Sequence, residues 1–409
     1  MRKPSVGIIF LTVFIDLIGF GIVIPLLPIY AKNFHAAGLG IGALMSTFSF
    51  MQFFFAPRLG RLSDRIGRRP VLLTSTAGAC VSYFIFAYGS TLQGSSALLL
   101  LFLSRAVAGI CGANIGVAQA YIADITPPEQ RSKRMGLIGM AFGLGFIFGP
   151  PLGGLARLRF GPAGPGIVAA ILCAANFLLA WFILPESWKP SSEHAAQRPH
   201  WDQWMHTLRR PKVGLLVVVF FLATFCFTCF ETTLGLLIFQ TFSIEPESAP
   251  GVRLVANLFM YAGFVGALAQ GATGQLVKRL GEPKLVAVSL FLVAISLGPL
   301  PFARNWPEIY VLLAILGIGS SLTRPPVFGM ISHLTDAREQ GVTIGVAQGA
   351  GALARIVGPI FAAVLFTLIP PLPYAICAGL AFLTGILAWI QLSKDSEPAM
   401  AVGEPNPEV

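Results

Sequence analysis

The chain has 409 residues, of which 55% are hydrophobic and only 11% are charged, and its formal net charge is +10. A soluble domain carries about 25% charged residues, so this composition excludes an ordinary water-soluble fold. Apolar stretches recur from end to end, each long enough to cross a hydrocarbon layer roughly 30 Å thick.

The predicted elements are twelve membrane-spanning helices, because lipid offers no partners to exposed backbone N–H and C=O groups. The first stretch is too long for the apolar core of a signal peptide and contains Asp16, so it is expected to be the first span. In chain order the predicted spans cover residues 6–30, 39–57, 71–90, 97–124, 135–157, 165–184, 213–242, 252–275, 285–303, 308–334, 342–368 and 374–392. The predicted fold class is therefore an all-α membrane protein.

The distribution of Lys and Arg predicts the orientation of these spans. Of the 28 basic residues, 20 lie on the side of the two termini and five on the opposite side. The positive-inside rule then places both termini in the cytoplasm of a multi-pass protein in the plasma (inner) membrane. The basic excess is thus a topology signal, and a nucleic-acid partner is not expected.

Residues 185–212 are polar and separate two similar halves, residues 1–184 and 213–392, with 393–409 as a short cytoplasmic tail. Two such halves of six spans form pseudo-symmetric bundles in one known transporter architecture. Within the linker, Trp204 and Leu208 have helical spacing, which fits either a short helix on the inner leaflet or a plain linker with anchoring tryptophans. Four residues recur 209 positions later: Thr126, Gly136, Gly149 and Pro150 reappear as Thr335, Gly345, Gly358 and Pro359.

Four segments carry recognisable patterns. The first span has D-x-x-G-x-G-x-x-x-P from Asp16, and the connection after the second span reads G-x-L-x-D-R-x-G-R-R from Gly60. Its glycines permit a tight turn between two helices. The fourth span has L-x-x-x-R-x-x-A-G around Arg105, and 100° steps place Arg105, Gly109, Gly112, Gly116 and Gln119 on one face, as expected of a cavity wall.

The fifth span contains glycines four residues apart, so one face of the helix has no side chains and a neighbour can approach closely. Pro150 removes a backbone hydrogen bond there and permits a kink. The complete pattern consists of Gly136, Gly145, Gly149, Pro150, Gly153 and Gly154.

On these four segments the chain resembles the major facilitator superfamily, and within it the 12-span drug:proton antiporters that include tetracycline exporters. The resemblance implies the major facilitator fold, in which the fifth-span glycines form the antiporter motif. It also implies a latch between the halves on the inside: Asp64 faces the start of the eleventh span, and Arg68 pairs with Asp124. The predicted latch residues are Gly60, Asp64, Gly67, Arg68, Arg69 and Asp124.

Five charged residues lie deep inside predicted spans, where each costs at least about 2.5 kcal/mol on insertion scales. They are Asp16, Arg105, Glu231, Arg324 and Arg355, each on a stripe of small or polar residues to which Gln119 and Gln348 also belong. They could form fixed ion pairs between helices or line a transport cavity. Because an apolar cavity favours the neutral form of a carboxyl group, such an acid can exchange protons near neutral pH.

Three functions are considered. The first is proton-coupled export of small hydrophobic or amphipathic compounds, such as drugs or antibiotics, with Asp16 and Glu231 carrying protons and Arg105 tuning Asp16. Tetracycline itself is doubtful as cargo, because the exporters are expected to carry acids in the third and ninth spans, and residues 71–90 and 285–303 contain none. The second function is a carrier for a metabolite such as an organic anion, since the deep charges sum to +1. The third is a receptor or scaffold that does not transport.

The sequence contains no H-E-x-x-H, no G-x-S-x-G and no P-loop lysine, so neither an enzyme nor an ATP-driven pump is expected. The C-x-x-C of Cys226 and Cys229 lies in an apolar span without further ligands, which favours packing over a metal site. The expected partners are therefore a small-molecule substrate, protons and the lipid bilayer, with the proton gradient in place of a cofactor and a monomer sufficient for function.

Overall fold

The computed structural model describes residues 5–33, 38–187, 201–246, 248–335 and 339–393. Within these ranges the chain is helical and has no strand, and 12 segments are long and apolar enough to cross a membrane. The predicted fold class, an all-α membrane protein with twelve spans, is confirmed. Residues 188–200 of the predicted linker and 394–409 of the predicted tail lie outside the described residues.

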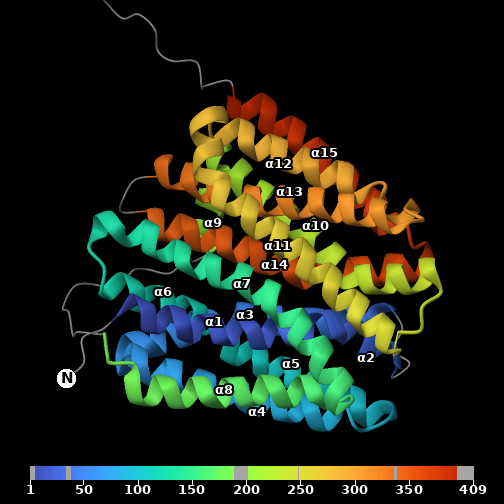
Figure 1. Ribbon diagram of the computed structural model, residues 1–409. Coiled ribbons are helices and arrows are strands. Elements are labelled where there is room, and N and C mark those ends of the chain that lie inside the picture. Colours follow the sequence, from blue (N-terminus) through green and yellow to red (C-terminus); the bar gives the residue numbers. More distant parts are fainter. Residues whose placement is uncertain (1–4, 34–37, 188–200, 247, 336–338, 394–409) are drawn as a thin grey trace, which may run out of the picture.

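Figure 1 shows two helical bundles side by side, the earlier part of the chain in one and the later part in the other. The first contains α1 (Val6–Val23), η1 (Ile24–Leu26), α2 (Leu27–Asn33), α3 (Gly38–Ile66), α4 (Arg68–Gly89), α5 (Gly94–Cys111), η2 (Gly112–Asn114), α6 (Ile115–Asp124), α7 (Pro128–Phe160) and α8 (Gly164–Ile183). The second contains α10 (Pro211–Phe242), α11 (Ala249–Leu280), α12 (Glu282–Leu297), η3 (Leu300–Phe302), α13 (Trp306–His333), α14 (Gln340–Leu368) and α15 (Leu372–Ser393), preceded by α9 (Trp201–Arg209).

Two predicted spans are interrupted by a short 3₁₀ turn. In the first span Pro25 lies within η1, where its missing N–H cannot continue the α-helical ladder. In the fourth span the break is η2, and Gln52 of α3 donates a hydrogen bond of 2.8 Å to the Gly112 carbonyl in it. A 3₁₀ turn has about 3.0 residues per turn, so residues before and after η2 do not share the single face that 100° steps predict.

The turn between α3 and α4 lies later than the sequence pattern suggested. Gly60 lies inside α3, which continues to Ile66, while Gly67 forms the turn with a φ of 101°. Gly281, between α11 and α12, has a φ of 78°. The two halves therefore use a left-handed glycine at the same place, which only a residue without Cβ adopts freely.

Three groups of buried apolar residues show how the halves meet. One lies in the first half only, between residues 9 and 184, and one in the second half only, between 216 and 392; both lie toward the ends that carry the basic connections. The third joins the halves at the opposite end, where η1 packs against α10 and α11 and α2 packs against α10. The halves thus share a core at one end and are separate at the other.

The linker helix α9 packs against α10 and α14 of the second half. The Trp204 ring lies so close to Gly349 of α14 that a methyl group at position 349 would approach it to 2.6 Å. Met205 and Leu208 are exposed. Residues 201–209 of the linker therefore form a short helix, and this helix lies against the second bundle.

The glycine face of α7 contacts α1. Gly145 lies against the backbone of Leu17, and Gly149 and Gly153 lie against Gly21 and Ile22. Gly154 instead faces α11 of the other half, where a methyl group would lie 3.0 Å from the Ala256 Cβ. Gly136 lies near the start of α7 and Pro150 in its middle.

Gly149→Ala is expected to destabilise the protein, because a methyl group at position 149 would lie 2.6 Å from the Gly21 Cα. Overpacking of this kind costs about 1–3 kcal/mol, and backbone atoms cannot move aside as a flexible side chain does. The measurement is the thermal unfolding temperature of the purified protein in detergent. Gly271→Ala is the control, because nothing lies within 4 Å of its Cβ position and it reports helix propensity alone. Equal shifts in the two variants would show that the α1–α7 contact tolerates a methyl group.

Candidate functional site

A cavity of about 920 Å³ lies between the two halves. Its walls come from α1, α3, α6 and α7 of the first half and from α10, α11, α13 and α14 of the second. It extends to Arg58 and Arg61 near the end of α3, to Trp204 of α9 and to Gly341 at the start of α14. The cavity therefore reaches the end with the basic connections, while the shared core closes the other end.

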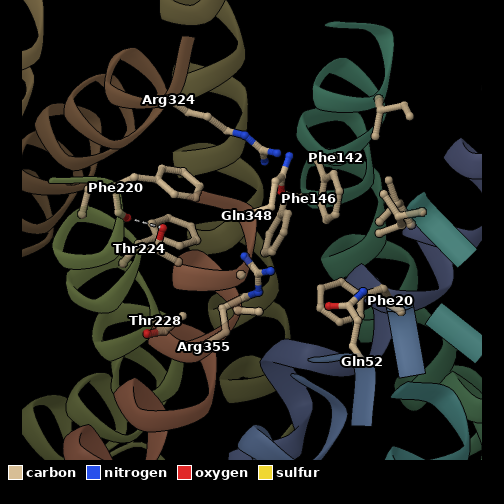
Figure 2. A pocket seen from close by; sticks show the side chains of 18 of the residues that line it. Phe20, Gln52, Phe142, Phe146, Phe220, Thr224, Thr228, Arg324, Gln348 and Arg355 are labelled. Carbon is tan, nitrogen blue, oxygen red and sulfur yellow. Dashed lines mark hydrogen bonds between the residues drawn. The ribbon is translucent and has the colours of Figure 1, made fainter. Parts of the chain in front are cut away.

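The second half contributes most of the polar lining. Glu231 comes from α10, Arg324 from α13, and Gln348 and Arg355 from α14. Figure 2 shows the arginine and glutamine side chains projecting into the same open space. The predicted stripes on these helices face it too, and they contribute Thr224, Thr228, Gly317, Ser320, Ser321 and Ala352.

The first half contributes a mainly aromatic wall. Phe142 and Phe146 of α7 and Phe20 of α1 lie across the cavity from the arginines (Figure 2). Gln52 and the predicted Gln119 also line this side. Phenylalanines line both walls, since Phe220, Phe227, Phe230 and Phe259 come from the second half. The deep charged groups Glu231, Arg324 and Arg355 come from the second half only, so a ligand opposite them meets phenylalanine rings of the first half.

Glu231 is the one carboxyl residue among the described lining residues of the large cavity. It is only 9% exposed, and its Oε1 has no hydrogen-bond partner in the described structure. The charged groups that act on it are Arg355 of α14 and Arg105 of α5. Glu231 is thus a buried carboxyl group with one oxygen that lacks a hydrogen bond, under the influence of two arginines.

Asp16 lies elsewhere, within the first half, and does not line the large cavity. Its carboxylate accepts hydrogen bonds from Asn176 of α8 at 2.8 Å and from Asn114 of η2 at 3.2 Å. Asn176 also donates to the Thr12 carbonyl at 2.9 Å, and a small cavity of about 50 Å³ adjoins Asp16 and Tyr83. Sequence reasoning missed both asparagines, although a buried amide inside an apolar span carries the same kind of signal as a buried charge.

Arg105 is 2% exposed and lies over the Phe48 ring, 4.7 Å from its centroid. The helix face of small residues that carries Arg105 packs against α3, because Gly109 and Gly112 lie against Phe48. The expectation of a cavity wall therefore fails for this part of the span, while Gly116 and Gln119, beyond η2, do line the cavity. In the described part of the chain Arg105 donates no hydrogen bond to Asp16, whose carboxylate is held by the two asparagines.

The predicted latch residues converge at the end of the first half. Arg68 pairs with Asp64 and with Asp124, at 3.1 Å for the latter. The Glu186 carboxylate, which follows α8, accepts from the backbone N–H groups of Arg68 and Arg69 at 2.9 and 3.1 Å. Sequence analysis did not single out Glu186. These contacts hold the α3–α4 turn, with Gly60 and Gly67 on either side of Asp64, to the ends of α6 and α8.

Comparison with known proteins gives a consistent picture. The sequence profile of the Major Facilitator Superfamily matches residues 9–302 and 254–408. The chain is 34% identical over 370 residues to the class E tetracycline resistance protein of Escherichia coli, covering 87% of this chain and 86% of the relative. It is 26% identical to multidrug resistance protein 2 of Bacillus subtilis (strain 168), covering 97% of this chain and 98% of that relative. The crystal structure of the human organic anion transporter MFSD10 (TETRAN) superposes with a TM-score of 0.73 at 26% identity, covering 95% of this chain and 100% of that one.

Proposed function

The chain belongs to the major facilitator superfamily, and from this premise we infer that it is a proton-coupled exporter of small amphipathic compounds. We place it in the plasma (inner) membrane with both termini in the cytoplasm, working as a monomer. The two halves rock about the central cavity and open it to one side at a time. In the structure the cavity is open toward the basic end, which on this topology is the cytoplasm.

The observation that carries the proposal is the aromatic cavity with buried charges between the halves. It is large enough for a drug-sized molecule, has phenylalanines on both walls and deep ionisable groups on the second-half wall, and contains a buried acid, Glu231. The relatives named for tetracycline and multidrug resistance support export as the direction.

Tetracycline is not proposed as the cargo. The third and ninth spans, predicted as residues 71–90 and 285–303, contain no Asp or Glu, whereas the resemblance leads one to expect acids there in tetracycline exporters. A panel of structurally different drugs is therefore the appropriate screen.

Asp16→Asn is expected to abolish pH-gradient-driven transport without abolishing cargo binding. The substitution keeps the size of the side chain but removes the group that can take up and release a proton, and Asp16 lies outside the lining of the large cavity. The measurements are drug susceptibility of cells that express the variant and cargo binding by the purified protein. Asp202→Asn, an exposed acid on α9, is the matched control. Full gradient-driven activity of the Asp16 variant would remove this residue from proton coupling.

The proposed function itself is tested with the wild-type protein in proteoliposomes. Cargo identified in the drug panel should move against its gradient when a pH gradient is imposed, and labelled cargo should exchange without one. Absence of both gradient-driven movement and exchange would favour the receptor or scaffold hypothesis over a transporter.

A further inference from the structure

Arg324 and Arg355 are the two arginines that line the large cavity deep within the spans. Arg324 of α13 and Arg355 of α14 form neither an ion pair nor a hydrogen bond with any residue in the described ranges. Arg324 lies over the rings of Phe220 and Phe328, 5.8 and 5.6 Å from their centroids. Because an unpaired cation within a membrane bundle is costly, these positions suggest a counter-charge that comes from outside the chain.

The two guanidinium groups lie on the same side of the cavity and project into it, with Gln348 pointing into the same space (Figure 2). They are close enough to repel each other electrostatically. An anion placed between them would relieve that repulsion, and a planar guanidinium binds carboxylate, sulfonate and phosphate oxygens in pairs. Gln348 can donate a further hydrogen bond from its amide.

The charge of the cavity favours an anion over a cation. Glu231 is the one acidic residue in its described lining, and both Arg355 and Arg105 act on that carboxyl group. Asp16 contributes no charge to this space, because it lies inside the first half with its two asparagines. A lipophilic cation would therefore enter a region in which arginines outnumber carboxylates.

We propose that the cargo is an amphipathic anion whose carboxylate, sulfonate or phosphate group binds between Arg324 and Arg355. Its apolar body rests on Phe20, Phe142 and Phe146 of the opposite wall. Glu231 is then the internal competitor for Arg355, and its protonation leaves that arginine to the cargo. This assignment of the cargo rests on the transport function proposed above.

The test uses two probes of equal apolar size, naphthalene sulfonate and naphthyl trimethylammonium, and measures their binding to the purified full-length protein in detergent by calorimetry. The wild type should bind the sulfonate at least about tenfold more tightly than the ammonium, the factor expected for one charge-assisted hydrogen bond. Arg324→Gln and Arg355→Gln should each lose about that factor for the sulfonate alone. Glu231→Gln should bind the sulfonate more tightly.

Arg253→Gln is the matched control, because this arginine is exposed on α11 and does not line the cavity; it should bind both probes as the wild type does. Arg355→Lys, which keeps the charge and loses the paired geometry, should give intermediate affinity and serves if the glutamine variant does not fold. Equal wild-type affinity for the two probes, or equal loss of both in the arginine variants, would overturn the proposal.

Failure of this proposal and failure of the transport function give different results. Binding in detergent needs no gradient, so selective sulfonate binding without any flux in proteoliposomes would refute the transport function and retain the anion site. Gradient-driven flux of cations and anions alike would refute the anion site and retain the transporter.

Discussion

Replacement of Glu231 by Gln is expected to reduce pH-gradient-driven transport to the level of protein-free liposomes. Glu231 is the one carboxyl group in the described lining of the large cavity, it is 9% exposed, and its Oε1 has no hydrogen-bond partner in the described structure. Glutamine has the same volume but cannot take up or release a proton. Because the group lies where cargo binds, its loss should remove the link between proton movement and cargo movement.

The measurement compares two activities of the same variant in proteoliposomes. Movement of cargo against its gradient, driven by pH, should disappear, while exchange of labelled for unlabelled cargo should remain, because exchange needs the rocking motion but no net proton transfer. Glu245→Gln is the matched control, an exposed acid between α10 and α11. Normal pH-driven accumulation by the Glu231 variant would place the coupling proton elsewhere in the protein.

Gly42→Leu is expected to drive the protein out of the conformation seen here. At the closed end α3 packs against α14 of the other half, and a Cβ at position 42 would lie 2.8 Å from the Pro359 carbonyl oxygen and 3.0 Å from the Ile360 nitrogen. One turn further along α3, Ser46 donates a hydrogen bond of 2.5 Å to the Ile356 carbonyl. A leucine cannot fit between two backbones at this distance, so the halves must separate at this end.

The size of the effect follows from the cost of overpacking, about 1–3 kcal/mol, which shifts a two-state equilibrium by about 5- to 150-fold. Only the conformation in which α3 packs against α14 is destabilised by the leucine. The population therefore moves toward the state that is open at the other side. Spin labels at exposed positions 65 and 278, which lie at the basic end of the two halves, should therefore approach each other. The six native cysteines would first be replaced.

Gly379→Leu is the control, because nothing lies within 4 Å of its Cβ position in α15. Its label distances should match those of the parent protein. If Gly42→Leu also left the distances unchanged, the α3–α14 contact would not determine which side is open.

The sequence alone determined the spans. An apolar stretch of about 20 residues must cross the membrane as a helix whatever surrounds it, so the predicted ranges agree with the helices to within a few residues at most ends. The exceptions are the extensions of α3 to Ile66, of α11 to Leu280 and of α7 back to Pro128. The close approach of α7 to a neighbour could also be predicted from the sequence, because Gly145, Gly149 and Gly153 lie on one face of any α-helix.

Only the tertiary structure decided which buried charge meets which partner. Asp16 and Glu231 look alike in sequence, each an acid in the first helix of its half. Asp16 is held by Asn114 and Asn176, 98 and 160 residues away, while Glu231 lies in the cavity under the influence of Arg105 and Arg355. Hydropathy and helical spacing are properties of a short stretch of chain and can be summed along it. The environment of a charge depends on helices that are distant in sequence: Arg105 packs over Phe48 of α3, while Gln119 of the same span lines the cavity.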